Sequence, residues 1–512
     1  MTSDEKTPGS SPIEARTGLD PWGRGELPAP PDTRGLRILK VVGPGAIVLG
    51  AAIGSGEWLI GPAVFVRYGL SLLWVTLAAA FFQALFNTEL VRYTLYTGEP
   101  IVTGFMRTKP HATFWGWLYA GLYFLQNGWP AWAGASAGAF FFLGAGRAAR
   151  ADESGPVYLV ALAVFAVCVL ILLFGGKRIE HTLEMLNWVM VAGVLLALAA
   201  LCLLFASPAN AWAAVVGFFG FDAATGSFKF IPEGADWFLV GAFAAFSGCG
   251  GVTNLTLSSW ARDKGYGMGS VVGYIPTVVG GQKVHLAHTG TTFEPTPLAL
   301  ESWRGWWRIV RADQWGIFFV GAMLGMALPG MLYTSLIPRG TDLRGLNIAT
   351  ELARALSERA GPSLTIVVAV MSAWILFKVQ IDILESTVRS VTDILWGASK
   401  RVRAYSDVRR VYYSVLAVSV CWGAFALTLT APIILLQVAA NVAGLVFALS
   451  ALHVLRVNTT LLPEALRPPM WRRVALVLMA TFYGAFVWMW LMGGLLPDTA
   501  KGFLFKLLRG GV

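Results

Sequence analysis

Two short clusters of glycine, each followed directly by polar residues, interrupt otherwise apolar segments of this sequence. The first cluster is Gly54-Ser55-Gly56, and Glu57 follows it; the second is Gly250-Gly251, and Val252-Thr253-Asn254 follows it. Glycine breaks a helix readily and leaves backbone amides and carbonyls bare, so a carboxylate, hydroxyls and an amide would meet these groups at one place. Such oxygen atoms suit the binding of a small cation. The candidate substrate-binding residues here are Gly54, Ser55, Glu57, Gly251, Thr253 and Asn254.

A second set of ionisable residues is regularly spaced along a later apolar segment. Lys378, Asp382, Glu385, Arg389 and Asp393 are separated by four, three, four and four residues. At 100° per residue they form a stripe roughly 80° wide, which in a membrane helix has to face the protein interior or a water-filled vestibule. Opposite charges three or four residues apart can also pair along the helix. We assign coupling or gating to the first three, and a structural ladder of ion pairs is the alternative, above all for the last three.

Two amides on another apolar segment could add neutral oxygen ligands. Gln437 and Asn441 are four residues apart, so they share one face of a helix. The alternative for both is a hydrogen bond between helices. A metal ion in the predicted site would be bound by Glu57, Asn254 and Gln437.

Four more polar residues lie close together in the segment 70–96. Gln83 and Asn87 are expected to hold helices together, and Glu89 with Arg92 indicates a pair at the protein surface or at a gate. The sequence contains no HExxH, Ser/His/Asp or Walker-type pattern, and its four cysteines form no CxxC pair. We therefore expect no enzyme activity, no cofactor and no disulfide framework.

The elements that must position these residues are membrane helices. Of the 512 residues, 56% are hydrophobic and only 13% are charged, whereas soluble proteins carry about 25% charged residues. Apolar stretches long enough to span a bilayer, roughly 17–25 residues each, recur along the chain, and we number them helices 1 to 11. They cover residues 43–67, 70–96, 114–143, 157–175, 185–206, 236–261, 313–337, 363–388, 410–430, 432–455 and 472–496.

The distribution of charge places the two ends of the chain. The first forty residues are polar and rich in proline, lack the apolar core of a signal peptide, and predict a disordered tail. Most of the Lys and Arg residues fall in this tail and in the loops on its side of the membrane, which predicts a cytoplasmic N-terminus and an extracytoplasmic C-terminus in the cell membrane. This asymmetry and attraction to anionic lipid explain the net charge of +10, so membrane lipid is an expected partner and nucleic acid is not.

The two glycine clusters lie in helices 1 and 6, five helices apart. An interrupted membrane helix survives only where it lines a cavity or a site, because its freed backbone groups find no water. The spacing predicts two inverted repeats of five helices with discontinuous helices 1 and 6, and close packing through glycine is the alternative. The predicted domains are 1–40 (disordered cytoplasmic tail), 41–206 (first repeat), 207–235 (extracytoplasmic loop), 236–455 (second repeat, with cytoplasmic loop 262–312) and 456–512 (helix 11 and extracytoplasmic tail).

The end of loop 262–312 has a distinctive composition. Segment Ser302–Arg311 interleaves three tryptophans with three arginines. This pattern suits a short helix lying at the cytoplasmic membrane interface, with indole rings at headgroup level and guanidinium groups in water. An ordinary linker is the alternative.

The opening of helix 1 resembles a known family. Gly43-Pro44-Gly45, a segment ending at Trp58 and the run Tyr68-Gly69-Leu70-Ser71-Leu72-Leu73-Trp74 are similar, without a gap, to the G-P-G, D-P-G-N-W and Y-G-Y-S-L-L-W of the Nramp (natural resistance-associated macrophage protein) divalent-metal transporters. Looser similarity follows at Asn254–Ser259 and Gln437. The resemblance implies an all-α membrane protein of eleven transmembrane helices with the LeuT-type fold, acting as a secondary transporter.

The residues that bind metal in that family differ in this chain. Gly54 stands where the family has an Asp, Glu57 where it has an Asn, and Gly251 where a helix 6 motif has a Met. Without the thioether, hard ions such as Mg²⁺ or Mn²⁺ are favoured. The titratable residues that the family uses on helices 3 and 9 are also missing, which predicts transport that is uncoupled from protons or relayed through helix 8.

A second likeness leaves an alternative open. Ile53–Gly56, followed by Gly61-Pro62, is also similar to the helix 1 break of the amino acid–polyamine–organocation transporters, whose glycine amides hold a substrate carboxylate. Glu57 would repel a carboxylate and attract a cation. We therefore predict a carrier of a small cation, above all a divalent metal ion, working by alternating access as a monomer. An amino-acid or organic-cation carrier is the alternative, and a sensor or scaffold is a third that the charged helix 8 disfavours.

Overall fold

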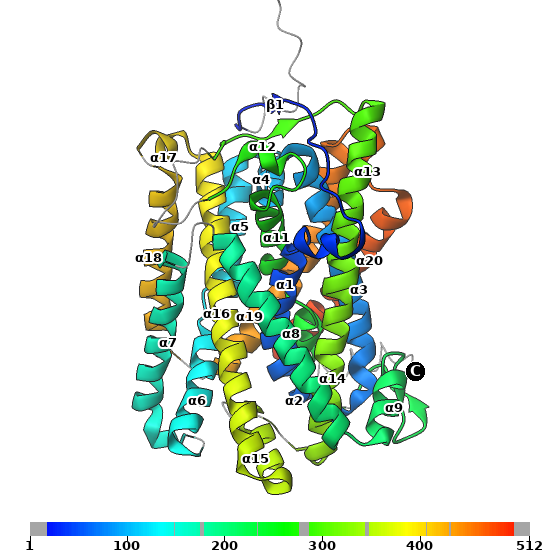
Figure 1. The fold of residues 1–512 in the computed structure, drawn as a ribbon, viewed down its shortest axis with the longest axis vertical. Helices are drawn as coiled ribbons and strands as arrows, with labels where there is room; N and C mark the ends of the chain where they lie inside the picture. The colour runs from blue at the N-terminus through cyan, green and yellow to red at the C-terminus, as the bar shows by residue number, and fades with distance from the viewer. Residues whose placement is uncertain are drawn as a thin grey trace, which may run out of the picture.

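The computed structural model describes residues 18–147, 149–174, 179–232, 234–275, 286–341, 343, 348–405, 407–429 and 432–495. Packed helices, most of them running roughly along the long axis of the molecule, make up this part of the chain (Figure 1). Residues 1–17 of the predicted tail, residues 276–285 of the predicted loop and residues 496–512 at the C-terminus lie outside the described residues.

The elements follow one another in this order, with η3 and η6 being π-helical and the other η segments 3₁₀ turns. The first half contains β1 (Gly23–Arg24), η2 (Gly35–Lys40), α1 (Pro44–Ala52), η3 (Ile53–Ile60), α2 (Gly61–Tyr68), η4 (Leu70–Leu72), α3 (Leu73–Thr97), α4 (Ile101–Met106), α5 (Ala112–Asn127), α6 (Ala131–Ala145), η5 (Ala151–Glu153), α7 (Ser154–Phe174), α8 (Ile179–Phe205) and α9 (Pro208–Gly217). The second half contains β2 (Phe221–Asp222), β3 (Ser227–Phe228), α10 (Trp237–Phe246), α11 (Val252–Asp263), α12 (Gly269–Val272), β4 (Thr291–Thr292), α13 (Pro297–Arg311), η6 (Ala312–Phe319), α14 (Val320–Leu336), α15 (Ile348–Ala360), α16 (Pro362–Ala398), α17 (Lys400–Tyr405), α18 (Val408–Ala426), α19 (Pro432–Thr460), η8 (Glu464–Leu466) and α20 (Met470–Leu495).

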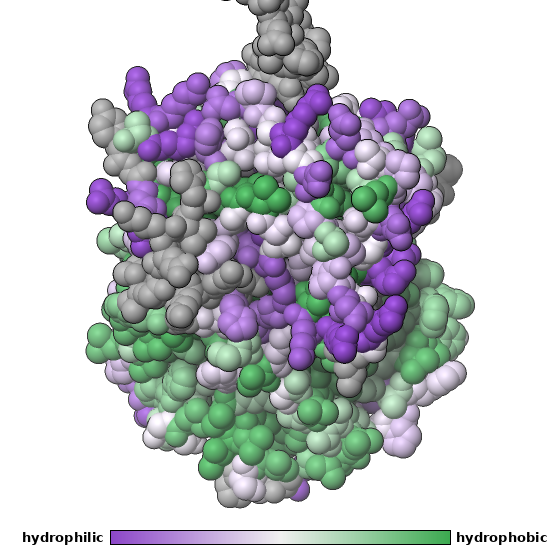
Figure 2. All heavy atoms as spheres, turned by 45° about the horizontal axis from the view of Figure 1, so that its top comes forward, coloured by the Kyte–Doolittle hydropathy of each residue, from purple (hydrophilic) through white to green (hydrophobic). Residues whose placement is uncertain are grey.

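Every predicted membrane span overlaps a helix of the structure. Within the described residues, eight helices are long and apolar enough to cross a membrane, and α10 is a shorter apolar helix. Predicted helices 3 and 6 are each divided in two, at 128–130 and at 247–251. Figure 2 shows hydrophobic side chains over the lower part of the molecule and hydrophilic ones at the end that carries β1. The count of eleven crossings and the domain boundaries stay predictions.

Helix 1 is not interrupted, although the sequence predicts a break in it. Its backbone stays helical from Pro44 to Tyr68, but the glycine cluster lies in the wide turns of η3. Within it the Gly61 N–H donates to the carbonyl of Gly56, five residues earlier. A π-helical turn keeps backbone groups paired where no water is at hand, so it re-aims the following side chains without the cost of an unwound segment.

Helix 6 is discontinuous, as predicted. The chain leaves α10 at Phe246 and enters α11 at Val252. Between them Gly248, Gly250 and Gly251 have φ angles of 120°, 100° and 52°. L side chains rarely adopt such angles, which explains why glycine fills these three positions.

The packing of the half-helices agrees with an inverted repeat. The first half of helix 1 (α1) packs against α8, which is predicted helix 5, and the first half of helix 6 (α10) packs against α19, which is predicted helix 10. The second half of helix 1 (α2) packs against α14, and the second half of helix 6 (α11) packs against α3. Each half-helix therefore has the neighbour that a two-fold relation between the repeats requires.

Helix 1 begins on a buried carboxylate from the second repeat. Asp313 of η6 accepts hydrogen bonds from the backbone N–H of Gly43 at 3.0 Å and of Gly45 at 2.8 Å. These amides are bare because they lie at the N-cap and in the first turn of α1, where the helix offers no acceptor, and a carboxylate there also suits the helix dipole. The Gly43-Pro44-Gly45 motif thus marks a capped helix start.

Two sequence predictions about the flanking segments need correction. Residues 18–40 of the predicted disordered tail form, with Val41 and Val42, an ordered strap across one end of the bundle, where β1 pairs in parallel with β4 (Figure 1). The segment Ser302–Arg311, expected to be a separate interfacial helix or a linker, continues without interruption into η6 and α14. Its Trp303 and Trp306 are buried because they pack inside the protein, so they are not free to lie in a headgroup layer.

The crossing of helices 1 and 6 gives a direct test of this fold. A Cβ atom at Gly56 would lie 1.6 Å from the carbonyl oxygen of Phe246. Gly56→Ala should therefore cost more than the about 1–3 kcal/mol of ordinary overpacking, because neither backbone can move aside. The measurement is the yield of folded protein by size exclusion and its thermal unfolding. Gly193→Ala on α8 is the matched control, since its Cβ would have no neighbour within 4 Å; equal behaviour of the two variants would contradict this crossing.

Candidate functional site

The break in helix 6 is held from helix 3 by one glutamine. Gln126 at the end of α5 donates from Nε2 to the carbonyl of Gly250 at 3.0 Å and accepts at Oε1 from the N–H of Val252 at 2.9 Å. Both backbone groups lack helical partners, so this side chain replaces the bonds that the helix has lost. Its neighbour Asn127 donates to the hydroxyl of Thr253 at 3.2 Å.

A second glutamine holds the other side of the break. Gln83 of α3 accepts at Oε1 from the N–H of Cys249 at 3.0 Å and donates from Nε2 to the carbonyl of Ser247 at 3.1 Å. Gln83 therefore holds helix 2 to helix 6, and the prediction that it holds helices together is confirmed. Together the two glutamines fix the course of the backbone from 247 to 252, which pre-organises whatever site it lines.

Glu57 is buried beside this break without compensation. Its side chain is fully buried, and neither carboxylate oxygen has a hydrogen-bond partner among the described residues. Its stem faces α14, where a Cβ at Gly325 would lie 3.4 Å from the Glu57 Cγ. The backbone of Gly248, in the break, is near enough to act on the carboxyl group. A buried carboxylate without a partner is costly, so this group needs a proton or a cation.

Gly54 and Ser55, which lie just before Glu57 in η3, offer no free ligand side chain. A Cβ at Gly54 would lie 2.4 Å from Cγ2 of Val379 on α16. The Ser55 hydroxyl donates to the carbonyl of Ala51 at 2.9 Å and accepts from the Trp132 indole at 3.1 Å. The aspartate that the resembling family has at the Gly54 position therefore finds no space here, and Ser55 is occupied in packing.

The residues after the helix 6 break are engaged to different degrees. A Cβ at Gly251 would lie 2.8 Å from the Cα of Ala443 on α19, and the φ angle of Gly251 is 52°, so a larger residue would be strained there and a sulfur ligand cannot simply be restored. Asn254 donates from Nδ2 to Asn87 Oδ1 at 2.9 Å, while its own Oδ1 has no partner among the described residues. Asn254 Oδ1 is thus one free oxygen close to the break in sequence.

The Asn441 amide of helix 10 is directed at α10 and not at the break. Asn441 donates from Nδ2 to the carbonyl of Phe238 at 2.9 Å, near the start of α10, and also to the carbonyl of Gln437 at 2.9 Å. Phe238 precedes the end of α10 by two helical turns, roughly 12 Å. Asn441 therefore makes the interhelical bond that was the alternative prediction, and Gln437 is half-buried on the same stretch of α19.

The first pair of the helix 8 stripe lies against helix 1. Lys378 and Asp382 form a fully buried ion pair on α16. Asn187 of α8 donates to Asp382 Oδ1 at 3.3 Å, and a Cβ at Gly50 would lie 3.2 Å from Lys378 Nζ. The predicted pairing along the helix and the inward direction of this face are both found in the structure.

One residue of the break lies within electrostatic range of both charged groups. The thiol of Cys249 is buried, and the charges of Asp382, Glu57 and Lys378 all act on it. The structure therefore gathers Glu57, the bare backbone of the break and the Lys378–Asp382 pair around one point where helices 1, 6 and 8 meet. This gathering is the candidate site.

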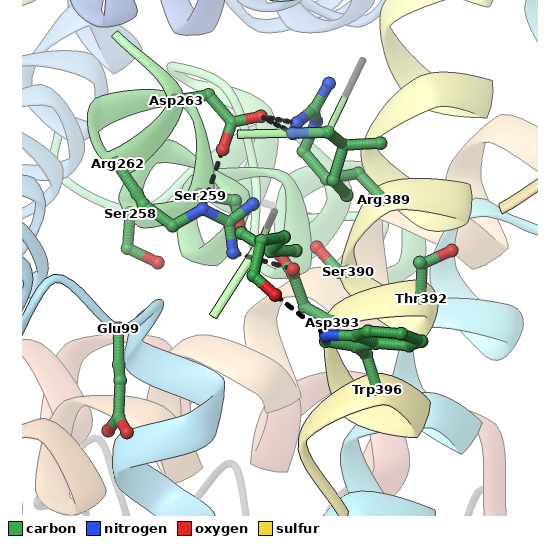
Figure 3. Close-up of polar contacts among 12 residues, drawn as sticks. Glu99, Ser258, Ser259, Arg262, Asp263, Arg389, Ser390, Thr392, Asp393 and Trp396 are labelled. Carbon is green, nitrogen blue, oxygen red and sulfur yellow. Dashed lines mark hydrogen bonds and ion pairs between the residues drawn. The ribbon is translucent and has the colours of Figure 1, made fainter. Parts of the chain in front are cut away.

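The rest of the stripe belongs to a separate network. Glu385 pairs with Arg389, which also contacts Asp263 at the end of α11. Arg262 lies 2.6 Å from Asp263 and 2.7 Å from Asp393. Figure 3 shows Arg262 and Asp263 of α11 facing Arg389 and Asp393 of α16. These buried charges tie α11 to α16, as the structural alternative held, although Asp393 pairs across the helices and not along its own.

The predicted pair Glu89 and Arg92 is buried and does not lie at the surface. Glu89 Oε2 lies 2.7 Å from Arg92, and Glu89 Oε1 lies 2.5 Å from Arg472 of α20. The guanidinium of Arg92 also stacks over the ring of Trp307 at 4.2 Å. This cluster joins α3, α13 and α20.

Sequence reasoning missed three residues on which the site depends. These residues are Gln126, Cys249 and Asp313. One signal existed for Gln126, because a predicted break with bare amides and carbonyls demands amide side chains on neighbouring helices. The cap on helix 1 could be sought in the same way, but nothing in the sequence pointed to Asp313.

The chemistry of the site is that of one buried carboxylate, without a partner in the described chain, beside a broken helix with bare backbone groups. In the described part of the chain, no group of three or more His, Cys, Asp or Glu residues is arranged to hold a metal ion. A cation bound at Glu57 would therefore complete its shell with backbone carbonyls, amide oxygens or water.

Comparison with known proteins places the fold. No protein-family model and no curated protein matches the sequence. Among solved structures, a mutant of the Eremococcus coleocola manganese transporter is similar at 13% identity with a TM-score of 0.62, covering 95% of this chain and 94% of that chain. Mhp1, a nucleobase-cation-symport-1 family transporter with bromovinylhydantoin bound, is similar at 12% identity with a TM-score of 0.53, covering 89% and 94%. This chain therefore has the predicted LeuT-type fold over nearly its whole length.

Proposed function

We propose that this chain is a secondary transporter that moves a small cation across the cell membrane by alternating access, with Glu57 as its principal charged ligand. The observation that carries the proposal is the buried carboxylate of Glu57, which has no partner among the described residues. Burying such a charge costs several kcal/mol unless a counter-charge is present. Carboxylates at this depth in membrane helices usually serve transport, and a bound cation would compensate this one.

A divalent ion such as Mg²⁺ or Mn²⁺ is the substrate that the surrounding atoms favour. Glu57 offers two free oxygens, and Asn254 Oδ1 is also without a partner in the described chain. Hard divalent ions accept carboxylate, amide and carbonyl oxygens and retain several waters, so one carboxylate is sufficient. The similarity in fold to a manganese transporter supports this choice.

An organic cation or amino acid is the second candidate. The absence of a three-ligand group in the described residues favours it, and Mhp1, of similar fold, has been solved with an organic ligand bound. An ammonium group would neutralise the charge of the Glu57 carboxylate, as a metal ion would. Binding experiments distinguish divalent metal ions from organic cations and amino acids.

We also infer how the chain is oriented in the membrane and whether its transport is coupled to protons. The distribution of Lys and Arg supports a cytoplasmic N-terminus and an extracytoplasmic C-terminus. Gln126 and Asn127 on helix 3 are amides that do not titrate, and both hold helix 6, so neither carries protons. We infer transport by a monomer that is either uncoupled from protons or relays them through Lys378 and Asp382.

Replacing Glu57 tests the proposed ligand. Glu57→Gln should weaken Mn²⁺ binding by about 100-fold, because the site loses its only free charge. The unliganded variant should be at least as stable as the native protein, since no hydrogen bond is lost. Uptake into proteoliposomes and the thermal shift on adding Mn²⁺, Mg²⁺ or amino acids are the measurements. Glu358→Gln, at an exposed ion pair, is the control; retained uptake in Glu57→Gln would remove Glu57 from the site.

The buried pair on helix 8 makes a second prediction. Lys378→Met should lower the free energy of unfolding by about 3–5 kcal/mol because it leaves Asp382 charged and alone. The double variant Lys378→Met, Asp382→Asn should recover most of this loss, as measured by titration with SDS in mixed micelles. In proteoliposomes loaded with a pH-sensitive dye, substrate should cause no acidification through the double variant. Acidification that persists would show a proton relay elsewhere.

A further inference from the structure

The N-terminal strap, residues 18–42, crosses the end of the bundle and is anchored between residues 20 and 28 and again at residues 41 and 42. Its first anchor is Asp20, whose carboxylate lies 3.1 Å from His288, 3.4 Å from Lys400 and 3.5 Å from Arg403. Lys400 and Arg403 belong to α17, after helix 8. The strap is therefore fixed to the link between helices 8 and 9.

The second anchor is a buried glutamate just beyond helix 2. Glu99 accepts from the indole of Trp22 at 3.0 Å, from Arg107 at 2.5 Å and from the backbone N–H of Gly290 at 2.8 Å. The Arg107 guanidinium also stacks on the Trp22 ring at 4.8 Å. Burial alone would raise the pKa of Glu99, but Arg107 and these donors outweigh it and lower the pKa, so the anchor stays charged at neutral pH.

The third anchor is on helix 7. Gly23 and Arg24 pair in parallel with Thr291 and Thr292, just before α13. The Trp306 indole of α13 then donates to the carbonyl of Pro28 at 2.8 Å. The strap thus continues along the helix that carries the cap on helix 1.

The last anchor is on the end of helix 6. Tyr266 donates to the carbonyl of Val41 at 2.9 Å, and Lys264 donates to the carbonyl of Val42 at 3.0 Å. Lys264 also pairs with Glu184 of α8 at 2.5 Å. Helix 1, with Glu57, begins directly after these residues.

These anchors lie on elements that must separate if this end of the bundle is to open. The strap is bonded to the link after helix 8, to the end of helix 2, to helix 7 and to the end of helix 6, and it is continuous with helix 1. We propose that residues 18–42 are a latch that holds this end of the transporter closed and that must detach before the site opens on that side. The proposal rests on the proposed transport function, because alternating access requires such an opening.

Locking the latch is the first test. Gly23 and Thr291 are register partners in the β1–β4 pair, so Gly23→Cys with Thr291→Cys can form a disulfide across it, in a chain that keeps the buried Cys249 and has alanine at Cys168, Cys202 and Cys421. Oxidation should reduce substrate uptake by about tenfold and reductant should restore it. Phe221→Cys with Phe228→Cys, the partners in the β2–β3 hairpin, is the control and should leave uptake unchanged. Full uptake with the Gly23–Thr291 disulfide formed would overturn the latch.

Releasing the latch is the second test, and it needs no substrate. Trp22→Ala and the milder Asp20→Asn each remove one anchor, and Cys249 serves as the only cysteine, replacing Cys168, Cys202 and Cys421 by alanine. Labelling of Cys249 by a membrane-impermeant maleimide from the strap side should become about tenfold faster with Trp22→Ala, since a charge-assisted hydrogen bond and a cation–π contact are lost. Trp212→Ala, an exposed residue of α9, is the control.

The two tests separate the latch from the transport proposal. Faster labelling in both strap variants, with no uptake of any substrate by the native chain, would keep the latch as an opening element and remove the transport function. The latch proposal would be overturned, whatever the substrate, if Trp22→Ala and Asp20→Asn leave the labelling rate unchanged. This holds provided that both variants unfold at the same temperature as the native protein.

Discussion

The crossing of helix 1 over the broken end of helix 6 is the constraint on which the rest of the structure depends. At Gly56 the backbone of helix 1 comes so close to the carbonyl of Phe246 that no side chain fits between them. This contact places the π-helical turns of helix 1 against the bare backbone of helix 6, which is why Glu57 meets the break at all. The glutamines of helices 2 and 3 then have to hold the break from outside, because the crossing leaves it no helical partners.

The buried charges divide into those that hold the protein together and one that does not. The groups around Glu89, around Glu99 and between Arg262 and Arg389 all have partners of opposite charge. Lys378 and Asp382 also neutralise each other. Glu57 alone among the buried acids discussed here lacks any partner in the described chain. In a fold that otherwise compensates its charges, such an exception indicates a ligand that comes and goes.

Hydropathy and glycine content were sufficient to predict the helices and the break in helix 6. The form of helix 1 was not predictable, because the same glycines permit either an unwound segment or a π-helical turn and only the tertiary contacts decide between them. Asn441 shows a similar limit. Its face on helix 10 was predictable, but the residue of α10 that it contacts depends on how helix 10 and α10 are shifted along each other. The strap was mistaken for a disordered tail because its composition is polar and proline-rich, and its order comes from partners such as Glu99 and Trp306 that lie far away in the sequence.

The latch and the site meet in helix 1, which begins where the strap ends and carries Glu57 in its middle. The central claim is that Glu57 receives the transported cation. Anomalous diffraction at the manganese edge, from crystals of the native chain grown with Mn²⁺, tests it most directly. We expect a peak about 2.0–2.6 Å from a Glu57 carboxylate oxygen, and its loss in Glu57→Gln. A bound ion elsewhere in the bundle, with no peak at Glu57, would contradict it.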